Sequence, residues 1–162
     1  MLKQGELEIR FYGDYSALDD FPLASDQSVK SFVIRSGKVP RNEILAIQRE
    51  ADFLLFLGSK PVIAGIGSTT GVVSGKIFEY LISGTEVLAV RVTDDMIAAQ
   101  MITQACAGDY YGNDVVKIKQ RLLRAVHAGG APKVIPNMSY LDQFKRSHQA
   151  LKVIKKVEAL VR

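Results

Sequence analysis

The sequence is poor in the residues that build disulfides and metal centres. It has one cysteine, Cys106, two histidines and no tryptophan among 162 residues. A single cysteine excludes an intrachain disulfide framework and a cysteine-clustered metal site, and two histidines leave little scope for zinc chemistry. No apolar run approaches the ~20 residues that span a bilayer, and the first residues lack the features of a signal peptide. We therefore expect a cytoplasmic protein.

What is present is the composition of an ordinary globular domain. Hydrophobic residues make up 48% of the chain and charged residues 23%, which are close to average values. A chain of this length buries about 70% of its unfolded surface, so it needs no covalent staples to fold. A disordered tail, a collagen-like repeat and a coiled coil are excluded.

The net charge of +4 is distributed unevenly. Residues 1–114 contain ten Lys and Arg against fifteen Asp and Glu, whereas residues 115–162 contain eleven against two. A basic third of this kind suits anionic lipid, nucleic acid or phosphates. Its lysines alternate with apolar residues at helical spacing, which favours the simpler interpretation of a solvated helix face.

Strands and helices are predicted to alternate along the chain. Short apolar segments that end near a glycine or a turn predict strands at 7–12, 32–35, 53–57 and 87–90. Helical periodicity predicts helices at 40–51, 75–83, 94–107, 113–126 and 141–161. Asn42 and Asn113 are the expected N-caps of two of them. This alternation indicates an α/β fold with a Rossmann-like open, mainly parallel sheet flanked by helices.

Glycines mark the carboxyl ends of the predicted strands. Gly13, Gly37 and Gly58 each follow a strand, and a loop rich in Gly, Ser and Thr continues at 59–74. Ligands of open α/β sheets bind outside the carboxyl ends of the strands, so we expect the binding edge where these turns and the loop converge. The loop glycines could instead serve only a mobile surface segment.

The most informative segment is 65–81. It is not a P-loop, because that pattern would need glycine at Thr70 and a serine or threonine at Ile77. Its glycines also fit a dinucleotide fingerprint poorly, because their spacing is one residue too long. The informative part is therefore the start of the helix that follows.

Ser74 is a good N-cap for this helix. The free N–H groups of Gly75, Lys76 and Ile77 would form an anion site, to which Lys76 adds its charge. A cation at a helix N-terminus is unfavourable, so the lysine suggests that an anion binds there. Glu79, one turn further along, could accept hydrogen bonds from a vicinal diol such as ribose. The simpler alternative is a Lys76–Glu79 surface ion pair.

The rest of this helix divides into two faces. We expect Lys76, Glu79 and Ser83 to share an exposed stripe. The opposite, core-facing side is predicted to consist of Ile77, Phe78, Leu81 and Ile82.

Segments 50–55, 74–84 and 87–89 resemble a known family, and the second reads Ser-Gly-Lys-Ile-Phe-Glu-Tyr-Leu-Ile-Ser-Gly. They look like the C-terminal donor-binding domain of GT-B-fold glycosyltransferases of the retaining, glycogen-synthase-like superfamily. The Gly-Lys-Ile-Phe-Glu-Tyr-Leu block is similar to bacterial members that build polysaccharides. Weaker similarity extends from Leu7 to the final helix, so the resemblance covers most of the chain.

The resemblance implies a nucleotide-sugar donor and no metal or other cofactor. Glu79 matches the glutamate that binds the donor ribose, and Lys76 would stabilise charge on the departing diphosphate. Backbone groups at Lys38 and Val39 would hold the base, and Gly13 would line the base and ribose pocket. The segment that would cradle the diphosphate and sugar consists of Thr70, Gly71, Val72, Val73, Ser74, Gly75 and Lys76. We find no credible catalytic base or nucleophile in the chain.

The chain also departs from the family. Gly71 stands where the first motif glutamate would be. The family's first strand and helix, and its N-terminal acceptor domain, have no counterpart after Met1. The resemblance therefore implies a sheet without its central strand, and a chain that is inactive without the acceptor domain.

The resemblance also suggests two parts. Residues 1–143 would form the nucleotide-sugar-binding domain, and 144–162 a basic amphipathic helix that packs on it or on the acceptor domain. Phe144, Leu151, Ile154 and Val157 would meet that partner surface. The lysines would face water or an anionic membrane surface at the inner face of the membrane. Nucleic acid is not an expected partner.

Two other classes stay open. A non-catalytic nucleotide-binding or interaction module would keep the fold without the chemistry, and Gly71 favours it. A nicotinamide-dependent oxidoreductase would place Arg91 near a 2′-phosphate, but it gives Lys76 and Glu79 no role. Residues Tyr110 and Tyr111 could contact an acceptor or a partner domain, or pack in an interface.

Three minor features have simpler explanations. Asp94 and Asp95 are best explained as acids in the first turn of a helix. Cys106 is expected to be a small core residue. The two histidines lack the partners of a catalytic triad.

Overall fold

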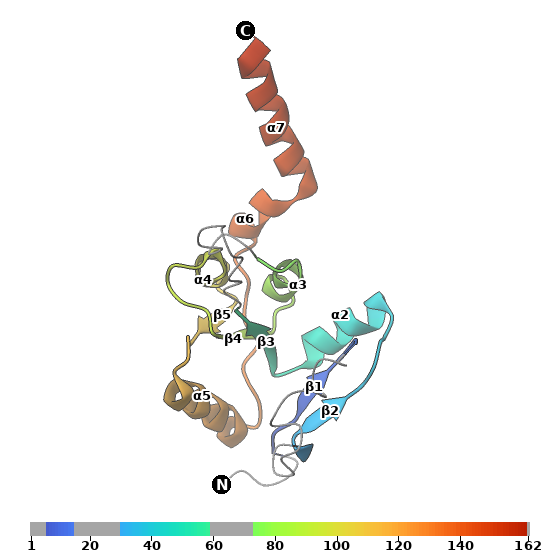
Figure 1. The fold of residues 1–162 in the computed structure, drawn as a ribbon, viewed down its shortest axis with the longest axis vertical. Coiled ribbons are helices and arrows are strands. Elements are labelled where there is room, and N and C mark those ends of the chain that lie inside the picture. The colour runs from blue at the N-terminus through green and yellow to red at the C-terminus, as the bar shows by residue number, and fades with distance from the viewer. Residues whose placement is uncertain (1–5, 15–29, 59–72, 162) are drawn as a thin grey trace, which may run out of the picture.

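The computed structural model describes residues 6–14, 30–58 and 73–161. Their strands form two parallel sheets. The smaller pairs β1 (Ile9–Phe11) with β2 (Val33–Arg35). The larger has the order β3-β4-β5, with β3 at Phe53–Leu57, β4 at Glu86–Val90 and β5 at Gly108–Tyr110. All described strand pairs are parallel and helices flank them, which confirms the predicted Rossmann-like open α/β fold (Figure 1).

The register of the larger sheet assigns each side chain to a face. Phe56 pairs with Ala89, and Ala89 pairs with Tyr110, so these three side chains share one face. Phe53 pairs with Glu86 on the opposite face. The two faces carry different chemistry, because the first is largely apolar and the second holds the charged Glu86 at the start of the central strand.

Helices α3 (Lys76–Leu81) and α4 (Ile97–Gln104) cover the apolar face. Ile77, Leu81 and Ile102 are fully buried there. In chain order α3 lies between β3 and β4, and α4 lies between β4 and β5. Their buried side chains join those of the strands in one cluster. This face of the larger sheet therefore holds the main hydrophobic core.

Helix α5 (Val115–Ala128) lies on the other face (Figure 1). The Nε of Arg121 donates a hydrogen bond of 2.8 Å to Glu86, and the guanidinium carbon lies 4.7 Å from the centre of the Phe53 ring. The Glu86 hydrogen bond raises the pKa of Arg121. A buried ion pair and a cation–π contact thus attach α5 to β3 and β4.

The C-terminal part consists of α6 (Met138–Leu141), the 3-10 helix η3 (Asp142–Phe144) and α7 (Arg146–Val161). The single helix predicted at 141–161 is wrong, because the backbone at Lys145 is extended and interrupts it. α7 projects away from the sheets in Figure 1, and its residues 146–160 are exposed. Among the described residues, no helix combines the length and apolar character needed to cross a bilayer.

Phe144, expected to meet a partner surface, instead packs within the chain. Its ring lies 5.5 Å from that of Phe78 and 5.4 Å from that of Tyr140, edge-on in both cases. This cluster attaches η3 to α3, and it borders the main core. The exposed apolar face of the last helix therefore begins after Phe144, not at it.

The N-caps predicted at Asn42 and Asn113 are both wrong. Helix α2 (Arg41–Glu50) has Pro40 at its N-cap and no side-chain cap, because the proline ring has no hydrogen-bond acceptor. In α5 the cap is Asp114, whose carboxylate accepts a 2.9 Å hydrogen bond from the Lys117 amide. Asn113 lies one residue too early for this contact.

Strand β5 was not predicted, because its sequence has no apolar run. Its first residue, Gly108, has φ 151, and a Cβ there would lie 2.2 Å from the carbonyl oxygen of Val87. Glycine therefore allows the close approach of β5 to β4. Cys106, just before this strand, is exposed with φ 52, so its assignment to the core was wrong.

Candidate functional site

The carboxyl ends of β1 and β2 meet at two glycines. The Gly13 amide donates a 2.7 Å hydrogen bond to the Gly37 carbonyl, and the φ angles are 117 and 70. A Cβ on either residue would meet no heavy atom of the described residues within 4 Å, so glycine is needed here for its backbone conformation and not for lack of space. The predicted base-binding residues Lys38 and Val39 follow directly, so they lie on the turn that adjoins Gly13.

An ion pair connects this edge to α3. The Nη2 of Arg41 lies 2.8 Å from the Oε1 of Glu79, and the Arg41 side chain is 78% exposed against 29% for Glu79. Because Arg41 is only two residues beyond Val39, the pair brings the predicted base-binding turn next to the predicted ribose-binding glutamate. Arg41 was missed from the sequence, because its partner is 38 residues away and no local pattern joins them.

The predicted alternative, a Lys76–Glu79 ion pair, is not present among the described residues, where Glu79 pairs with Arg41. The N-terminus of α3 is also a weaker anion-binding site than expected. Gly75 is the N-cap residue of α3, and the Lys76 amide reaches the Ser74 hydroxyl only at 3.4 Å. With six residues, α3 has a small dipole, so attraction of an anion to this tip would come mainly from the charge of Lys76.

The predicted faces of α3 are correct in part. Ile77 and Leu81 are fully buried, but Phe78 is 38% exposed and Ile82 56% exposed. Ser83 does not continue the exposed stripe, since its hydroxyl donates to the carbonyl of Tyr80 at 2.7 Å. The helix ends at Leu81, so helical periodicity no longer applies to the residues after it.

Part of the predicted phosphate cradle lies outside the described residues, namely Thr70, Gly71 and Val72. Val73 is the first described residue after them, and its side chain packs against the core. Only its backbone groups would therefore face a ligand. Ser74, Gly75 and Lys76 are exposed at the start of α3.

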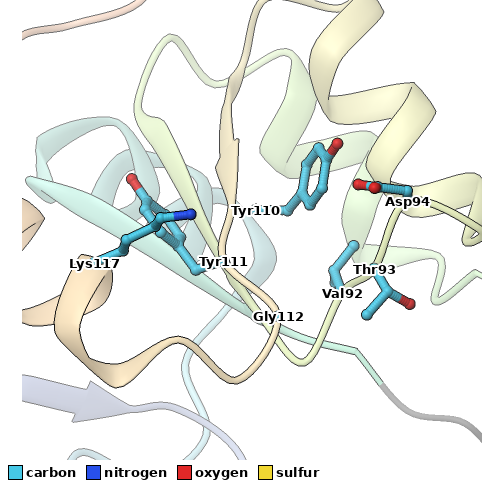
Figure 2. A pocket seen from close by; sticks show the side chains of 7 residues that line it. All are labelled: Val92, Thr93, Asp94, Tyr110, Tyr111, Gly112 and Lys117. Atoms are coloured by element: carbon cyan, nitrogen blue, oxygen red, sulfur yellow. The ribbon is translucent and has the colours of Figure 1, made fainter.

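The structure adds a cavity that the sequence did not predict. It has a volume of about 230 Å³ and lies at the carboxyl ends of β4 and β5 (Figure 2). A second cavity of about 200 Å³ shares Thr93 and Gly112 with it, so the two adjoin. The first is lined by Val92, Thr93, Asp94, Tyr110, Tyr111, Gly112 and Lys117, and the second adds Gly58, Arg91 and Asn113.

Tyr110 and Tyr111 both line this cavity, and in Figure 2 they extend to opposite sides of the strand end. The Tyr110 hydroxyl bonds to the Asp94 carboxylate, toward which it points in Figure 2, and this contact raises the pKa of Tyr110. Burial raises the pKa of Tyr111. Both phenols therefore stay protonated at neutral pH. The sequence analysis named both tyrosines as possible contacts to an acceptor or a partner domain. It did not place them at the end of a strand, because β5, of which Tyr110 is the last residue, was not recognised.

Among the residues that the structure describes, no group of His, Cys, Asp and Glu is arranged to hold a metal ion. No protein-family model matches the chain, and a search of curated proteins finds no significant match. The likeness to glycosyltransferases thus depends on the sequence motif, and function is inferred below from the motif together with the geometry.

Proposed function

We propose that the chain binds a nucleotide-sugar donor and serves as the donor-binding domain of a glycosyltransferase. The observation that carries this proposal is the Arg41–Glu79 ion pair of 2.8 Å. Together with the 2.7 Å Gly13–Gly37 hydrogen bond, it links three sequence-distant segments that the motif assigns to one ligand. A shared ligand would need this juxtaposition, whereas unrelated surface residues would not.

Each group has a chemical role in this proposal. Glu79, with 29% of its side chain exposed, would accept hydrogen bonds from the ribose hydroxyls in place of, or together with, Arg41. Lys76 would neutralise charge on the diphosphate, and a departing diphosphate would be stabilised electrostatically, without a metal. Backbone groups of Lys38 and Val39 would hold the base.

The reaction itself would need further parts. The acceptor would be held by a separate domain, and the exposed apolar face of α7 would pack on that domain or lie on an anionic membrane. Transfer of the sugar to a glycan would then take place between the two domains. The chain described here would bind the donor but not turn it over by itself.

Calorimetric titration with UDP, GDP, ADP and NADPH, and with the nucleosides that match the diphosphates, tests the donor site. Lys76→Ala should weaken binding of the favoured diphosphate roughly 10- to 100-fold and leave nucleoside binding nearly unchanged, because one charged hydrogen bond is lost. Glu79→Ala should weaken both to a similar degree. Removing the ribose hydroxyls from the ligand should abolish the difference between Glu79→Ala and wild type.

Glu43→Ala is the matched control, since Glu43 is an exposed acid in the first turn of α2. It should bind as wild type does. If the Lys76 and Glu79 variants also bind as wild type, the donor site is refuted. Preferential binding of NADPH would favour the oxidoreductase instead.

A further inference from the structure

The larger sheet has a crevice where the chain divides onto its two faces. α4 leaves the carboxyl end of β4 on one face, and α5 leaves that of β5 on the other (Figure 1). In open α/β sheets, the space between two such diverging loops is the preferred place for ligands. The two cavities lie in this space, between the segments 91–94 and 110–117.

Backbone contacts fix the floor of this crevice. The Arg91 amide donates to the Gly112 carbonyl at 2.6 Å, and the Gly112 amide to the Val92 carbonyl at 3.1 Å. On the other side, a Cβ at Gly58 would lie only 2.4 Å from the Arg91 carbonyl oxygen. The ends of β3, β4 and β5 are therefore held together, which preorganises the groups that line the cavities.

The backbone conformation of Arg91 costs free energy that no described contact of its side chain explains. Its φ of 60 is in the left-handed region, which costs a non-glycine residue on the order of 1 kcal/mol or more. Its side chain is exposed, and among the described residues no hydrogen bond or ion pair of the guanidinium repays this strain. Glycine would adopt the same backbone without strain. The guanidinium thus has no structural role that explains its presence beside the cavity.

We propose that this crevice binds a small phosphorylated polyol, such as a sugar phosphate, separately from the proposed donor site. A volume of about 230 Å³ is below the roughly 300–1,000 Å³ of pockets for drug-sized ligands, so the ligand is small. The planar guanidinium of Arg91 suits the bidentate binding of a phosphate. The second cavity, which holds Arg91 and Asn113, is the phosphate end.

The first cavity has the groups that recognise hydroxyls. Asp94 accepts hydrogen bonds, and the Tyr111 ring offers an apolar surface for the carbon skeleton. The hydroxyl of Thr93 donates to Asp95 and that of Tyr110 to Asp94, so both hydroxyl oxygens can accept hydrogen bonds from the ligand. The Asp94 charge repels a phosphate, which fixes the orientation of the ligand. Lys117 is 3.5 Å from Asp114 and is already partly neutralised, so Arg91 is the main cation for the phosphate.

NMR titration of the full chain with glucose 6-phosphate, glucose and inorganic phosphate tests this site. The sugar phosphate should give saturable shifts at the amides of Thr93 and Gly112 and none at Gly13. Arg91→Gly should weaken its binding about tenfold or more, the loss of a charged hydrogen bond. The same variant should melt at or above the wild-type temperature because it removes strain, so misfolding cannot explain the loss.

Two further variants complete the test. Lys119→Ala, at an exposed lysine of α5, should bind as wild type and controls for net charge. Asp94→Asn should weaken binding of the sugar phosphate but not of phosphate. The proposal is overturned if the wild type shows no saturable binding at millimolar ligand, if Arg91→Gly binds equally well, or if phosphate binds as tightly as the sugar phosphate.

Discussion

The two sheets differ in how much hydrophobic core they hold. All seventeen buried hydrophobic residues of the described chain lie between Leu54 and Leu141, around the larger sheet. In 6–14 and 30–50 the only buried residue is Gln48. β1 and β2 also pair over only three residues. A two-stranded sheet of this kind has little stability of its own, so its order depends on contacts with the rest of the molecule.

The proposed donor site joins these unequal halves. Gly13 and Lys38 belong to the smaller sheet, whereas Lys76 and Glu79 belong to a helix that packs on the larger one. The Arg41–Glu79 pair is largely exposed on its arginine side, so it contributes at most about 1 kcal/mol to their association. The Arg49 carbonyl at the end of α2 adds two contacts, since it accepts hydrogen bonds from the Thr85 hydroxyl at 3.2 Å and from the Lys133 amino group at 2.7 Å. A ligand that contacts both halves would add to this coupling.

The largest difference is expected for apolar truncations. Leu81→Ala removes a fully buried side chain and should lower the free energy of unfolding by about 2–5 kcal/mol. Ile9→Ala, in the half-buried β1, should cost less than about 1 kcal/mol. Urea denaturation measures both. Equal losses would contradict the contrast between the two sheets.

Glycine substitutions should also cost more stability in the larger sheet than in the smaller one. Gly108→Ala forces a Cβ against the backbone of Val87 in the larger sheet and should cost about 3 kcal/mol or prevent folding. Gly13→Ala meets only conformational strain, so we expect a cost of about 1 kcal/mol. Thermal melting of both variants checks this, and a larger loss at Gly13 would show that the smaller sheet is tightly packed.

A substitution at Gln48, in α2, should stabilise the half of the molecule that contains the smaller sheet. Its Oε1 is buried without a hydrogen-bond partner among the described residues, which costs stability. Gln48→Met has a similar volume and no unsatisfied acceptor, so it should raise the free energy of unfolding by about 1 kcal/mol. Gln48→Asn keeps the polar group and is the control. A destabilised Gln48→Met variant would mean that the amide has a partner.

The smallest effect concerns pH and the cap of α5. The Lys117 amide lowers the pKa of Asp114, so the unfolded state binds its proton more readily than the folded state does. The resulting stability is present at neutral pH and is lost as the pH falls through the lowered, folded-state pKa. As the pH is lowered, the free energy of unfolding should therefore fall less steeply in Asp114→Asn than in the wild type. Identical pH profiles would show that the cap does not titrate.

Features with a local signal in the sequence could be predicted, whereas features that depend on contacts in the folded chain could not. Residues 53–57 and 87–90 were predicted as strands because both are continuous apolar runs, which are typical of strands covered on both faces. The structure has this coverage at β4, whereas Leu55 and Leu57 of β3 are exposed. β5 was not, because its pairing depends on a backbone approach that only Gly108 allows. The donor-site motif was visible locally, but Arg41 was not, since its contact with Glu79 arises only in the folded chain.

The division into two sheets was also beyond the sequence. The resemblance implied a missing central strand, but the arrangement of the remaining strands could not be predicted. The structure places β1 and β2 in one sheet and β3, β4 and β5 in another. Strand pairing depends on which partners are available, and this information does not lie within any one strand.

Hydrogen exchange with and without the nucleoside diphosphate that binds best tests the central claim, that one ligand spans both halves. We expect slower exchange on binding at 9–13 and 33–39, and at 74–79 in the start of α3. The amides of β4 at 86–90 should be protected already and should not change. Binding that leaves 9–13 and 33–39 unprotected would contradict the proposed donor site.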